Sequence, residues 1–223
     1  LNNLIKRYGG SFEMLNEKWR YCFWLKDVNP SLIKKSSVLI DRINKCKSFR
    51  ESTKSKSVNS KASTPYLFGD IRQPENDYLL IPRVSSHKRK YLPIGYISKE
   101  TILADSAYGL PNATKYQFGI LQSLMHNVWI RTVAGKLKSD YRYSNNLVYN
   151  NYPWPFEPSE KNKQKVEQKV EELMNNKSPT KKKKKVKGFL EPKKEDTKVS
   201  TNVVDMVAEH VVNIRKKRME LKG

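Results

Sequence analysis

Two apolar runs near the middle of the sequence restrict the possible folds more than any other segment. They are residues 77–84, "DYLLIPRV", and residues 91–98, "YLPIGYIS", and the polar stretch "SSHKRK" lies between them. Short runs rich in branched and aromatic side chains, joined by a polar loop, are typical of a β-hairpin. We predict two antiparallel strands here, with the charged side chains of the loop exposed at the tip.

Apolar residues at steps of three and four predict an amphipathic helix over residues 116–134. The stripe consists of Phe118, Leu121, Met125, Val128, Trp129 and Val133. This spacing places the six side chains on one face of a helix, and Gly135 is expected to end it. His126 lies within the same segment, and its expected role is that of a hydrogen-bonded structural histidine.

The first 64 residues combine an aromatic cluster with a basic segment. Within residues 11–30, the run "WRYCFWL" alternates in the manner of a partly buried strand, so we interpret its aromatic side chains as core. The sequence "NPS" at residues 29–31 indicates a turn or a helix cap. Residues 32–52 are compatible with a helix, whereas the Ser/Lys-rich stretch 53–64 is expected to be a mobile or partner-ordered loop.

These patterns together predict a mixed α/β (α+β) fold for residues 1–160, rich in β-hairpins, with amphipathic helices packed against them. Residues 161–223 are expected to form a helical, basic C-terminal extension that contains a flexible lysine-rich linker. No apolar run approaches the length needed to cross a membrane, so no membrane partner is expected. The sequence does not begin with methionine, and we expect the chain to be a piece of a longer protein.

The charge balance points to a polyanionic partner. The chain has 44 Lys and Arg residues against 22 Asp and Glu residues, a formal net charge of +22. The excess of basic side chains is present in residues 1–160 as well as in the C-terminal extension. Nucleic acid is the commonest polyanion that such proteins bind. A lysine-rich surface that is simply well solvated is the alternative explanation.

The segment "NNYPWP" at residues 150–155 looks like the Asn-Pro-Pro-aromatic motif with which adenine methyltransferases hold a flipped base. The order is wrong, because Tyr152 rather than proline follows the two asparagines. We predict instead an extended, proline-stiffened strand whose aromatic side chains pack against the fold. The chain also lacks a Gly-x-Gly sequence for S-adenosylmethionine, and its histidines, His87, His126 and His210, are scattered. We therefore expect no catalytic residue, metal ligand or cofactor site in this chain.

Two segments have the composition of a DNA-reading surface. The loop "RVSSHKRK", residues 83–90, combines basic side chains with two hydroxyls, which suits phosphate contacts and one or two contacts to base edges. In "LKSDYRYS", residues 137–144, an extended backbone would place alternate side chains on opposite faces. One face would carry Lys138, Asp140, Arg142 and Ser144, and the other Tyr141 and Tyr143.

A lysine and an aspartate on one face can read a single G·C pair. Lysine donates to guanine O6 and N7, and aspartate accepts from the cytosine amino group. A salt bridge between Lys138 and Asp140 on an exposed strand is the alternative.

Four separated blocks of the sequence resemble the target recognition domain of MmeI-like restriction–modification enzymes. The blocks are "GGSFEMLNEKWRYCFWLKD", "IRQPENDYLLIPRVSSHKRKYLPIGYI", "FGILQSLMHNVWIRTVAGKLKSDYRYS" and "VYNNYPWP", in the family's order. The likeness covers approximately residues 7–175. Members of this family are single-chain type II enzymes with endonuclease, adenine-N6 methyltransferase and DNA-recognition parts.

The resemblance implies which residues contact DNA. In the family, an α/β recognition domain follows the methyltransferase core and directs both activities to an asymmetric site. Carried over to this chain, the base-reading residues are Arg83, His87, Asp105, Ser106, Lys138, Asp140 and Arg142. The loop residues expected to bind phosphate are Ser85, Ser86, Lys88, Arg89 and Lys90. Family members with Lys and Asp in the last segment are associated with guanine, and His87 stands where the family has an acidic residue.

We expect the chain to be the DNA sequence-recognition domain of an adenine-N6 methyltransferase or a fused restriction–modification enzyme, docked in the major groove of double-stranded DNA. It is expected to be inactive alone, with S-adenosylmethionine bound by the methyltransferase core of the parent protein. Lysines within residues 34–61 and in the tail are expected to contact phosphate. The resemblance also implies a prokaryotic, cytoplasmic location, associated with the nucleoid through DNA.

Two other classes of protein remain open. The first is a stand-alone basic nucleic-acid-binding protein without an enzymatic partner. The second is an interaction or regulatory protein whose basic face binds an acidic partner.

Overall fold

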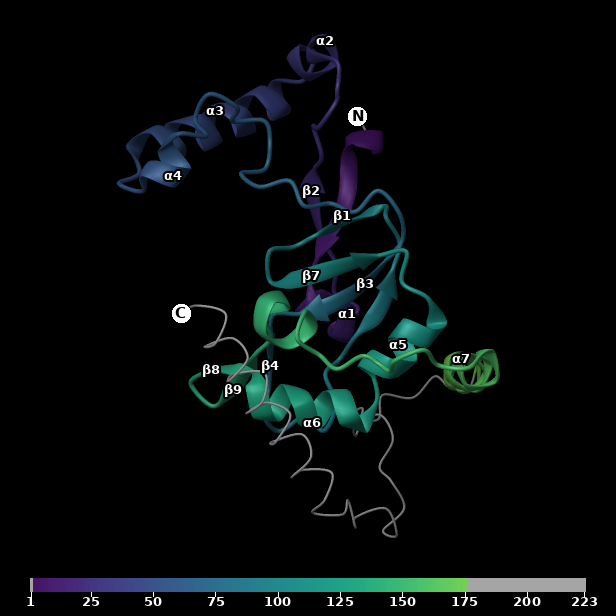
Figure 1. Cartoon of the computed structure of the whole chain (residues 1–223). Helices are drawn as coiled ribbons and strands as arrows, with labels where there is room; N and C mark the ends of the chain where they lie inside the picture. Colours follow the sequence, from purple (N-terminus) through teal and green to yellow (C-terminus); the bar gives the residue numbers. More distant parts are fainter. Residues whose placement is uncertain (1, 176–223) are drawn as a thin grey trace.

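The computed structural model describes residues 2–175, in which short strands and helices alternate. In chain order the elements are η1 (Asn2–Leu4), β1 (Ile5–Gly9), α1 (Ser11–Asn16), β2 (Arg20–Phe23), α2 (Pro30–Lys34), α3 (Ser37–Ser52), α4 (Lys56–Asn59), β3 (Tyr78–Pro82), β4 (Val84–Ser85), β5 (Gly95–Ile97), β6 (Thr101–Leu103), β7 (Ala107–Pro111), α5 (Lys115–Leu121), α6 (Leu124–Val133), β8 (Gly135–Leu137), β9 (Asp140–Arg142), η2 (Asn145–Tyr149) and α7 (Glu160–Asn175). Within these residues the strands form three small sheets, with the orders β2-β1-β6, β5-β3-β7 and β4-β9-β8 (Figure 1). The mixed α/β fold expected from the sequence is confirmed.

The predicted hairpin is present as the antiparallel pair β3–β5. β3 also pairs with β7, so both of its edges are hydrogen-bonded and all five of its residues are buried. Leu79, for example, lies opposite Tyr96 on one side and Leu110 on the other. The connection is longer than predicted, because the chain leaves β3 to form β4 in a different sheet before it returns to β5.

The segment predicted as one helix forms two helices, α5 and α6, separated at Ser123. The second helix starts afresh because the Ser123 hydroxyl accepts a hydrogen bond from the His126 amide at 3.1 Å and caps it. Gly135 does not end α6, since it is the first residue of β8. The predicted apolar face is buried in part: Leu121 and Trp129 lie in the hydrophobic core, whereas Met125 is 42% exposed.

β1 and β2 form an antiparallel arm, and β1 also pairs in parallel with β6. This confirms a strand in the "WRYCFWL" segment, but the interpretation of its aromatic side chains as core is wrong for Tyr21, which is 65% exposed. Phe12 of α1, from the same aromatic cluster, is 64% exposed. β2 is the outer strand of its sheet, and its first two residues, Arg20 and Tyr21, are both exposed.

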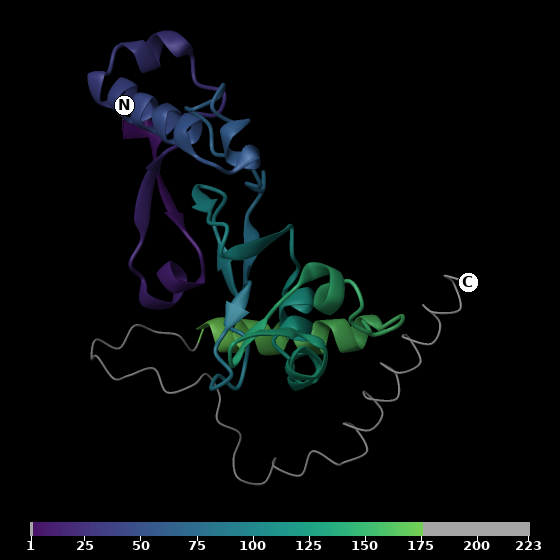
Figure 2. The ribbon, with the colours of Figure 1, turned by 90° about the vertical axis from the view of Figure 1, so that its left-hand side faces the viewer.

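The helices α2, α3 and α4 lie together at one end of the molecule, beyond the arm (Figure 2). Asn29 caps α2, as predicted, by accepting a hydrogen bond from the amide of the second helical residue. Residues 53–64 are not the mobile loop that we expected, because they contain α4 and are held by Arg50. Its guanidinium donates to three backbone carbonyl oxygens between residues 61 and 67, at 2.8, 2.9 and 2.7 Å.

Residues 150–155 do not form the predicted strand. They follow η2, a single π-helical turn, and have no strand partner among the described residues. The predicted packing of the aromatic side chains is confirmed, because Tyr152 is 6% exposed and meets His126 and Trp154 edge to face. Aromatic contacts, rather than backbone pairing, therefore hold this segment against the core.

α7 packs along α5, which brings the last described helix onto the body of the fold. A Cβ added at Gly119 would lie 2.4 Å from Cγ1 of Val166, so the two helices approach closely at this glycine. A helix was predicted at the start of the C-terminal extension and is present. It was expected to be exposed, but Val170 on it is buried. The proposed domain boundary at residue 160 stays a prediction, and the predicted linker and final helix lie outside the described residues. Within residues 2–175, no helix combines the length and apolar character that a membrane crossing requires.

Candidate nucleic-acid interface

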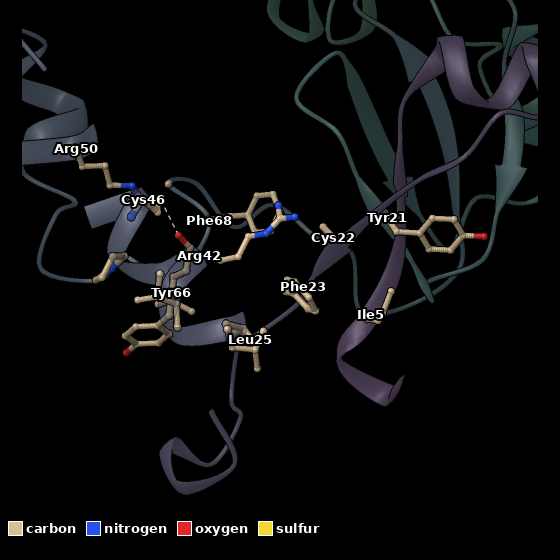
Figure 3. Close-up of a pocket in the computed structure, with 15 residues that line it drawn as sticks. Ile5, Tyr21, Cys22, Phe23, Leu25, Arg42, Cys46, Arg50, Tyr66 and Phe68 are labelled. Carbon is tan, nitrogen blue, oxygen red and sulfur yellow. Dashed lines mark hydrogen bonds between the residues drawn. The ribbon is translucent and has the colours of Figure 1, made fainter. Parts of the chain in front are cut away.

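A cavity of about 550 Å³ lies between the β1–β2 arm and α3 (Figure 3). Leu39 and Phe68 contribute to its apolar lining, and Cys22 and Cys46 border it as free thiols. Burial raises the pKa of the Cys22 thiol to about 11, so this side chain is a neutral thiol near pH 7 and a poor nucleophile. The side chains predicted to contact DNA do not line this cavity, so the candidate interface lies elsewhere.

The two segments predicted to read DNA come together in the sheet β4-β9-β8. β4 pairs with one edge of β9, where Val84 lies opposite Arg142, and β8 pairs with the other edge. Residues 83–90 and 135–142 thereby become neighbours, although they are distant in the sequence (Figure 1).

One face of this sheet is exposed, and the β4 and β9 part of the other face is turned toward the core, whereas Lys136 of β8 on that side is exposed. Ser85 and Tyr143 are 8% and 2% exposed, and Tyr141 is half-buried on the same inner side. Asp140 and Arg142 alternate with the two tyrosines and lie on the outer face. The predicted separation of charged and aromatic side chains is confirmed for these four residues.

Lys138 does not lie on the strand, which corrects the prediction of four side chains on one face. Together with Ser139 it forms the two-residue connection between β8 and β9, and its φ of 55° is in the left-handed region. Ser144 is also displaced from that face, because its hydroxyl accepts a hydrogen bond from the Leu147 amide and caps η2. Lys138 is instead exposed at the tip of the hairpin, two residues before Asp140.

His87 and Asp140 meet across the edge of this sheet. The His87 amide donates to Oδ1 of Asp140 at 3.2 Å, and Nδ1 of the imidazole lies 3.4 Å from the same oxygen. The two side chains are 43% and 40% exposed, so both are accessible to a ligand. The alternative to base reading, a salt bridge between Lys138 and Asp140, is not observed among the described residues.

The remaining loop residues form an exposed basic turn. The Arg89 amide donates to the Ser86 carbonyl at 3.0 Å, and the Lys88 amide to the Ser86 hydroxyl at 3.3 Å. Lys88, Arg89 and Lys90 are exposed, as phosphate contacts require. Ser85 differs from them, because its buried side chain lies on the inner face of the sheet.

Arg83 and Asp105 form a second charged pair on the same side of the fold. Nη1 of Arg83 lies 3.0 Å from Oδ1 of Asp105, and the guanidinium stacks over the Tyr108 ring at 4.7 Å from its centroid. The backbone also joins the two segments, since the Arg83 amide donates to the Ser106 carbonyl at 3.0 Å. Nε of Arg83 is buried without a hydrogen-bond partner among residues 2–175, which destabilises a fold by about 1–3 kcal/mol.

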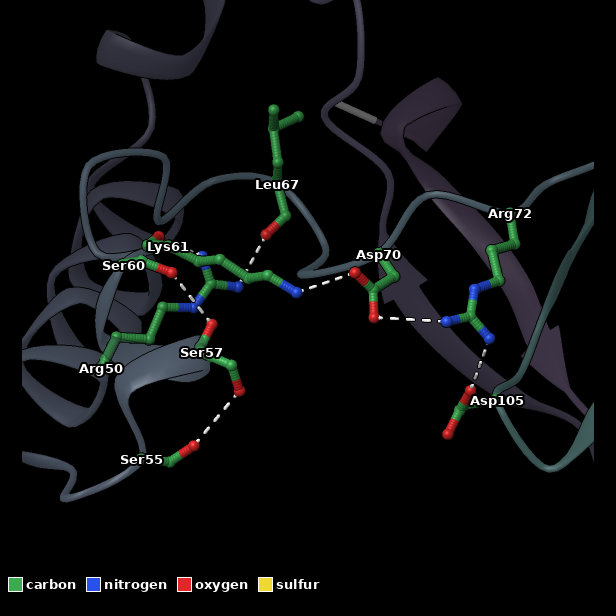
Figure 4. A network of polar contacts seen from close by, with 9 residues as sticks. All are labelled: Arg50, Ser55, Ser57, Ser60, Lys61, Leu67, Asp70, Arg72 and Asp105. Atoms are coloured by element: carbon green, nitrogen blue, oxygen red, sulfur yellow. Dashed lines mark hydrogen bonds and ion pairs between the residues drawn. The ribbon is translucent and has the colours of Figure 1, made fainter.

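A chain of ion pairs connects Asp105 to the helical end of the molecule (Figure 4). Arg72 lies 3.5 Å from Asp105 and 3.6 Å from Asp70, and Asp70 pairs with Lys61 at 2.7 Å. The Lys61 ammonium hydrogen-bonded to Asp70 holds the pKa of that carboxyl below its ordinary value. Arg72 and Tyr108 could not be identified from the amino-acid sequence, because each acts through a contact with a residue distant in the chain.

His126 contacts the sheet β4-β9-β8 at its buried side, through the residue that follows β9. It is fully buried on α6, where Nδ1 lies 2.7 Å from the Leu121 carbonyl oxygen and Nε2 lies 3.2 Å from the Tyr143 hydroxyl. Burial lowers the pKa of His126 to about 4, so the imidazole is neutral near pH 7. The predicted role as a satisfied structural histidine is confirmed, and the residue it bonds directly follows β9.

Three comparisons with known proteins agree with one another. The family model described as "MmeI, target recognition domain" matches residues 1–156. DNA methyltransferase A of Bacillus subtilis (strain 168) is 39% identical over 171 residues, which are 77% of this chain and 19% of that protein. A solved structure of the type IIL restriction–modification enzyme MmeI in complex with DNA matches with a TM-score of 0.75 and 39% identity, over 77% of this chain and 23% of that chain. The chain thus spans about a fifth of the length of these relatives.

Proposed function

This chain belongs to the family of MmeI target recognition domains, and from that membership we propose that it reads a specific DNA sequence from the major groove. The observation that carries the proposal is the sheet β4-β9-β8, whose outer face presents Asp140 and Arg142 next to the exposed basic turn that follows β4. A β-ribbon of this kind is narrow enough to enter the major groove, where the base edges are distinguishable. The net charge of +22 and the DNA bound in the related MmeI structure support the same assignment.

The tip of the β8–β9 hairpin would read one G·C pair. Asp140 has accessible carboxylate oxygen that can accept from the cytosine amino group, and Lys138 can donate to guanine O6 and N7. The contact from His87 orients Asp140 before DNA arrives, so less side-chain freedom is lost on binding. Arg142, on the same outer face, would contact a neighbouring base edge.

Arg83 and Asp105 would read a second base pair. Arginine bound to guanine O6 and N7 is the commonest specific contact in the major groove. Stacking on Tyr108 and pairing with Asp105 restrict the Arg83 guanidinium to one orientation. Asp105 is 81% exposed, which leaves its second carboxylate oxygen available for a cytosine amino group. The hydroxyl of the neighbouring Ser106 can donate to or accept from a base edge.

Phosphate contacts would position the duplex without reading its sequence. Lys88, Arg89 and Lys90 extend from the exposed turn beside the reading face, and the Ser86 hydroxyl lies within that turn. The lysines of residues 34–61 provide a second group of cations at the helical end. Contacts of this type make binding strongly dependent on salt concentration.

The catalytic chemistry would belong to the parent protein. We propose that a methyltransferase core joined to this domain binds S-adenosylmethionine and modifies adenine at N6. One relative of this chain is named a DNA methyltransferase and another a restriction–modification enzyme, which supports such a core. The role of this chain is then to hold the duplex in register while the core acts on the flipped base.

A sequence-selection binding assay tests the proposal directly. The full-length parent protein, and separately the 223-residue chain, are incubated with randomised duplex DNA, and the bound fraction is sequenced over several rounds. We expect both to enrich one asymmetric motif that contains at least two G·C pairs. Enrichment of no motif, with uniform and salt-sensitive binding, would favour a stand-alone basic nucleic-acid-binding protein instead. Absence of DNA binding would favour an interaction protein with an acidic partner.

A further inference from the structure

The sheet β4-β9-β8, which we call the reading sheet, carries two exposed apolar side chains among the charged groups of its outer face. Val84 of β4 is 38% exposed and Leu137 of β8 is 54% exposed. Val84 lies opposite Arg142, and Leu137 lies opposite Asp140. Directly paired residues of antiparallel strands have Cβ atoms about 5 Å apart and point to the same face. Each apolar side chain is therefore the immediate neighbour of a proposed base-reading residue.

Neither side chain belongs to the buried core of residues 2–175. The inner face of the same sheet supplies the buried residues, among them Ser85 and Tyr143. Single exposed apolar side chains are common on protein surfaces, so these two are informative only because each lies directly opposite a charged residue of the same face. Two such side chains beside charged groups suggest a ligand with both apolar and polar features.

The major groove offers one apolar feature at its floor, the C5-methyl group of thymine. The other groups through which base pairs are read there are hydrogen-bond donors and acceptors. An apolar protein surface or a lipid would bury Asp140 and Arg142 without partners, which is strongly unfavourable. Duplex DNA satisfies the charged residues and the apolar ones together, so charge complementarity selects it as the occupant of this face.

We propose that Leu137 and Val84 are specificity-determining residues that contact thymine methyl groups in the recognised sequence. This inference rests on the proposed DNA-reading function and adds apolar contacts to the hydrogen bonds by which the bases are read. Base pairs are stacked 3.4 Å apart, and neighbouring side chains of the sheet are about 5 Å apart. The methyl group contacted by Leu137 therefore lies within one or two steps of the base pair read by Asp140.

Replacement of thymine by deoxyuridine tests the proposal, because it removes the methyl group and keeps every hydrogen bond. The preferred duplex is taken from the selection assay with the 223-residue chain, and each dT is exchanged for dU in turn. We expect one exchange near the position read by Asp140, and another near the position read by Arg142, each to weaken binding by about 3- to 10-fold. In Leu137→Ala, binding to the dT duplex should fall by a similar factor, and the exchange near the Asp140 position should no longer change the affinity.

Leu32→Ala is the matched control, because Leu32 is 49% exposed but lies on α2, away from the reading sheet. This variant should distinguish dT from dU as the unaltered chain does. Val84→Ala provides a second test at an independent position should Leu137→Ala fail to fold. A recognised sequence without dT, or binding that no dU exchange changes, would overturn the inference. The inference would also be overturned if the dU effect near the Asp140 position persisted in Leu137→Ala and the one near the Arg142 position persisted in Val84→Ala. Loss of all sequence preference in the unaltered chain would instead contradict the proposed function itself.

Discussion

The carboxylate of Asp140 is held by a residue 53 positions earlier in the chain, His87, through contacts from both its amide and its imidazole at 3.2 and 3.4 Å. This relationship joins the loop after β4 to the hairpin β8–β9. It means that the two segments form one surface before DNA is bound. A substitution in one segment is therefore expected to change what the other reads.

Replacement of His87 by alanine should weaken discrimination by Asp140 without abolishing it. The backbone amide still contacts Oδ1, but the side-chain contact is lost, which amounts to about 0.5–1.5 kcal/mol, or about 2- to 10-fold in affinity. Affinities for the selected duplex and for one with the G·C pair reversed are measured by titration. The loss should be confined to the selected duplex, and an equal loss on both would show that His87 acts only through nonspecific attraction.

Exchange of Lys138 for glutamate together with Asp140 for arginine should change the preferred base pair at one position of the site. The new pair of side chains would accept from cytosine and donate to guanine in the reverse order. Repeating the sequence selection reveals the new preference. The matched control is Lys115→Glu with Glu171→Arg, which reverses an ion pair between α5 and α7. Both double variants leave the net charge of the chain unchanged. An unchanged preference in the first double variant would rule out base reading by this hairpin tip.

Substitution of Lys88 by alanine should weaken binding to all sequences about equally. A phosphate contact carries no sequence information, and its loss reduces the slope of log affinity against log salt by about 1. Titrations at several salt concentrations, with the selected and a scrambled duplex, measure both effects. Lys169→Ala on α7 removes one charge away from the sheet and should leave the slope nearly unchanged. A loss limited to the selected duplex would assign Lys88 to base reading.

Replacement of Lys138 by glycine should stabilise the fold while it weakens DNA binding. Lys138 has a φ of 55°, which disfavours an L-residue by about 1–2 kcal/mol but not glycine. The greater freedom of glycine in the unfolded chain offsets part of the stabilisation gained by removing this backbone strain. We therefore expect the free energy of unfolding to rise by up to about 1 kcal/mol. Urea denaturation and DNA titration measure the two effects. Glu17→Gly, at a φ of 54° after α1, should stabilise similarly without a change in binding.

Acidification should destabilise the domain through His126. Its pKa is lowered to about 4 in the folded state from an ordinary 6.5, because burial disfavours the imidazolium. The unfolded chain therefore takes up a proton at higher pH, and stability is retained above pH 6.5 but lost as the pH falls toward 4. The loss of unfolding free energy from this one residue is at most about 3 kcal/mol. Unfolding free energies at pH 7.5 and 4.5 should differ less in His126→Gln than in the unaltered chain, and an equal difference would exclude this residue as the cause.

Several elements could be predicted from local sequence patterns. The strands at residues 78–82 and 95–97, the cap at Asn29 and the helix over residues 160–175 each depend on residues close together in the chain. The prediction failed at Ser123, where a side-chain cap divided one apolar stripe between two helices. It failed also at residues 150–155, where aromatic packing holds the chain without strand pairing.

The chemical types of the candidate interface were likewise evident in the amino-acid sequence, since charge and hydrogen-bonding capacity belong to each side chain. Their arrangement was not. Lys138 belongs to a turn because β8 pairs with β9, and Asp140 faces His87 because β4 pairs with the same strand. Likewise, the stacking of Arg83 on Tyr108 and the exposure of Leu137 arise from contacts between distant segments. Periodicity reports which neighbours share a face, whereas the pairing of remote strands depends on the free energy of the whole fold.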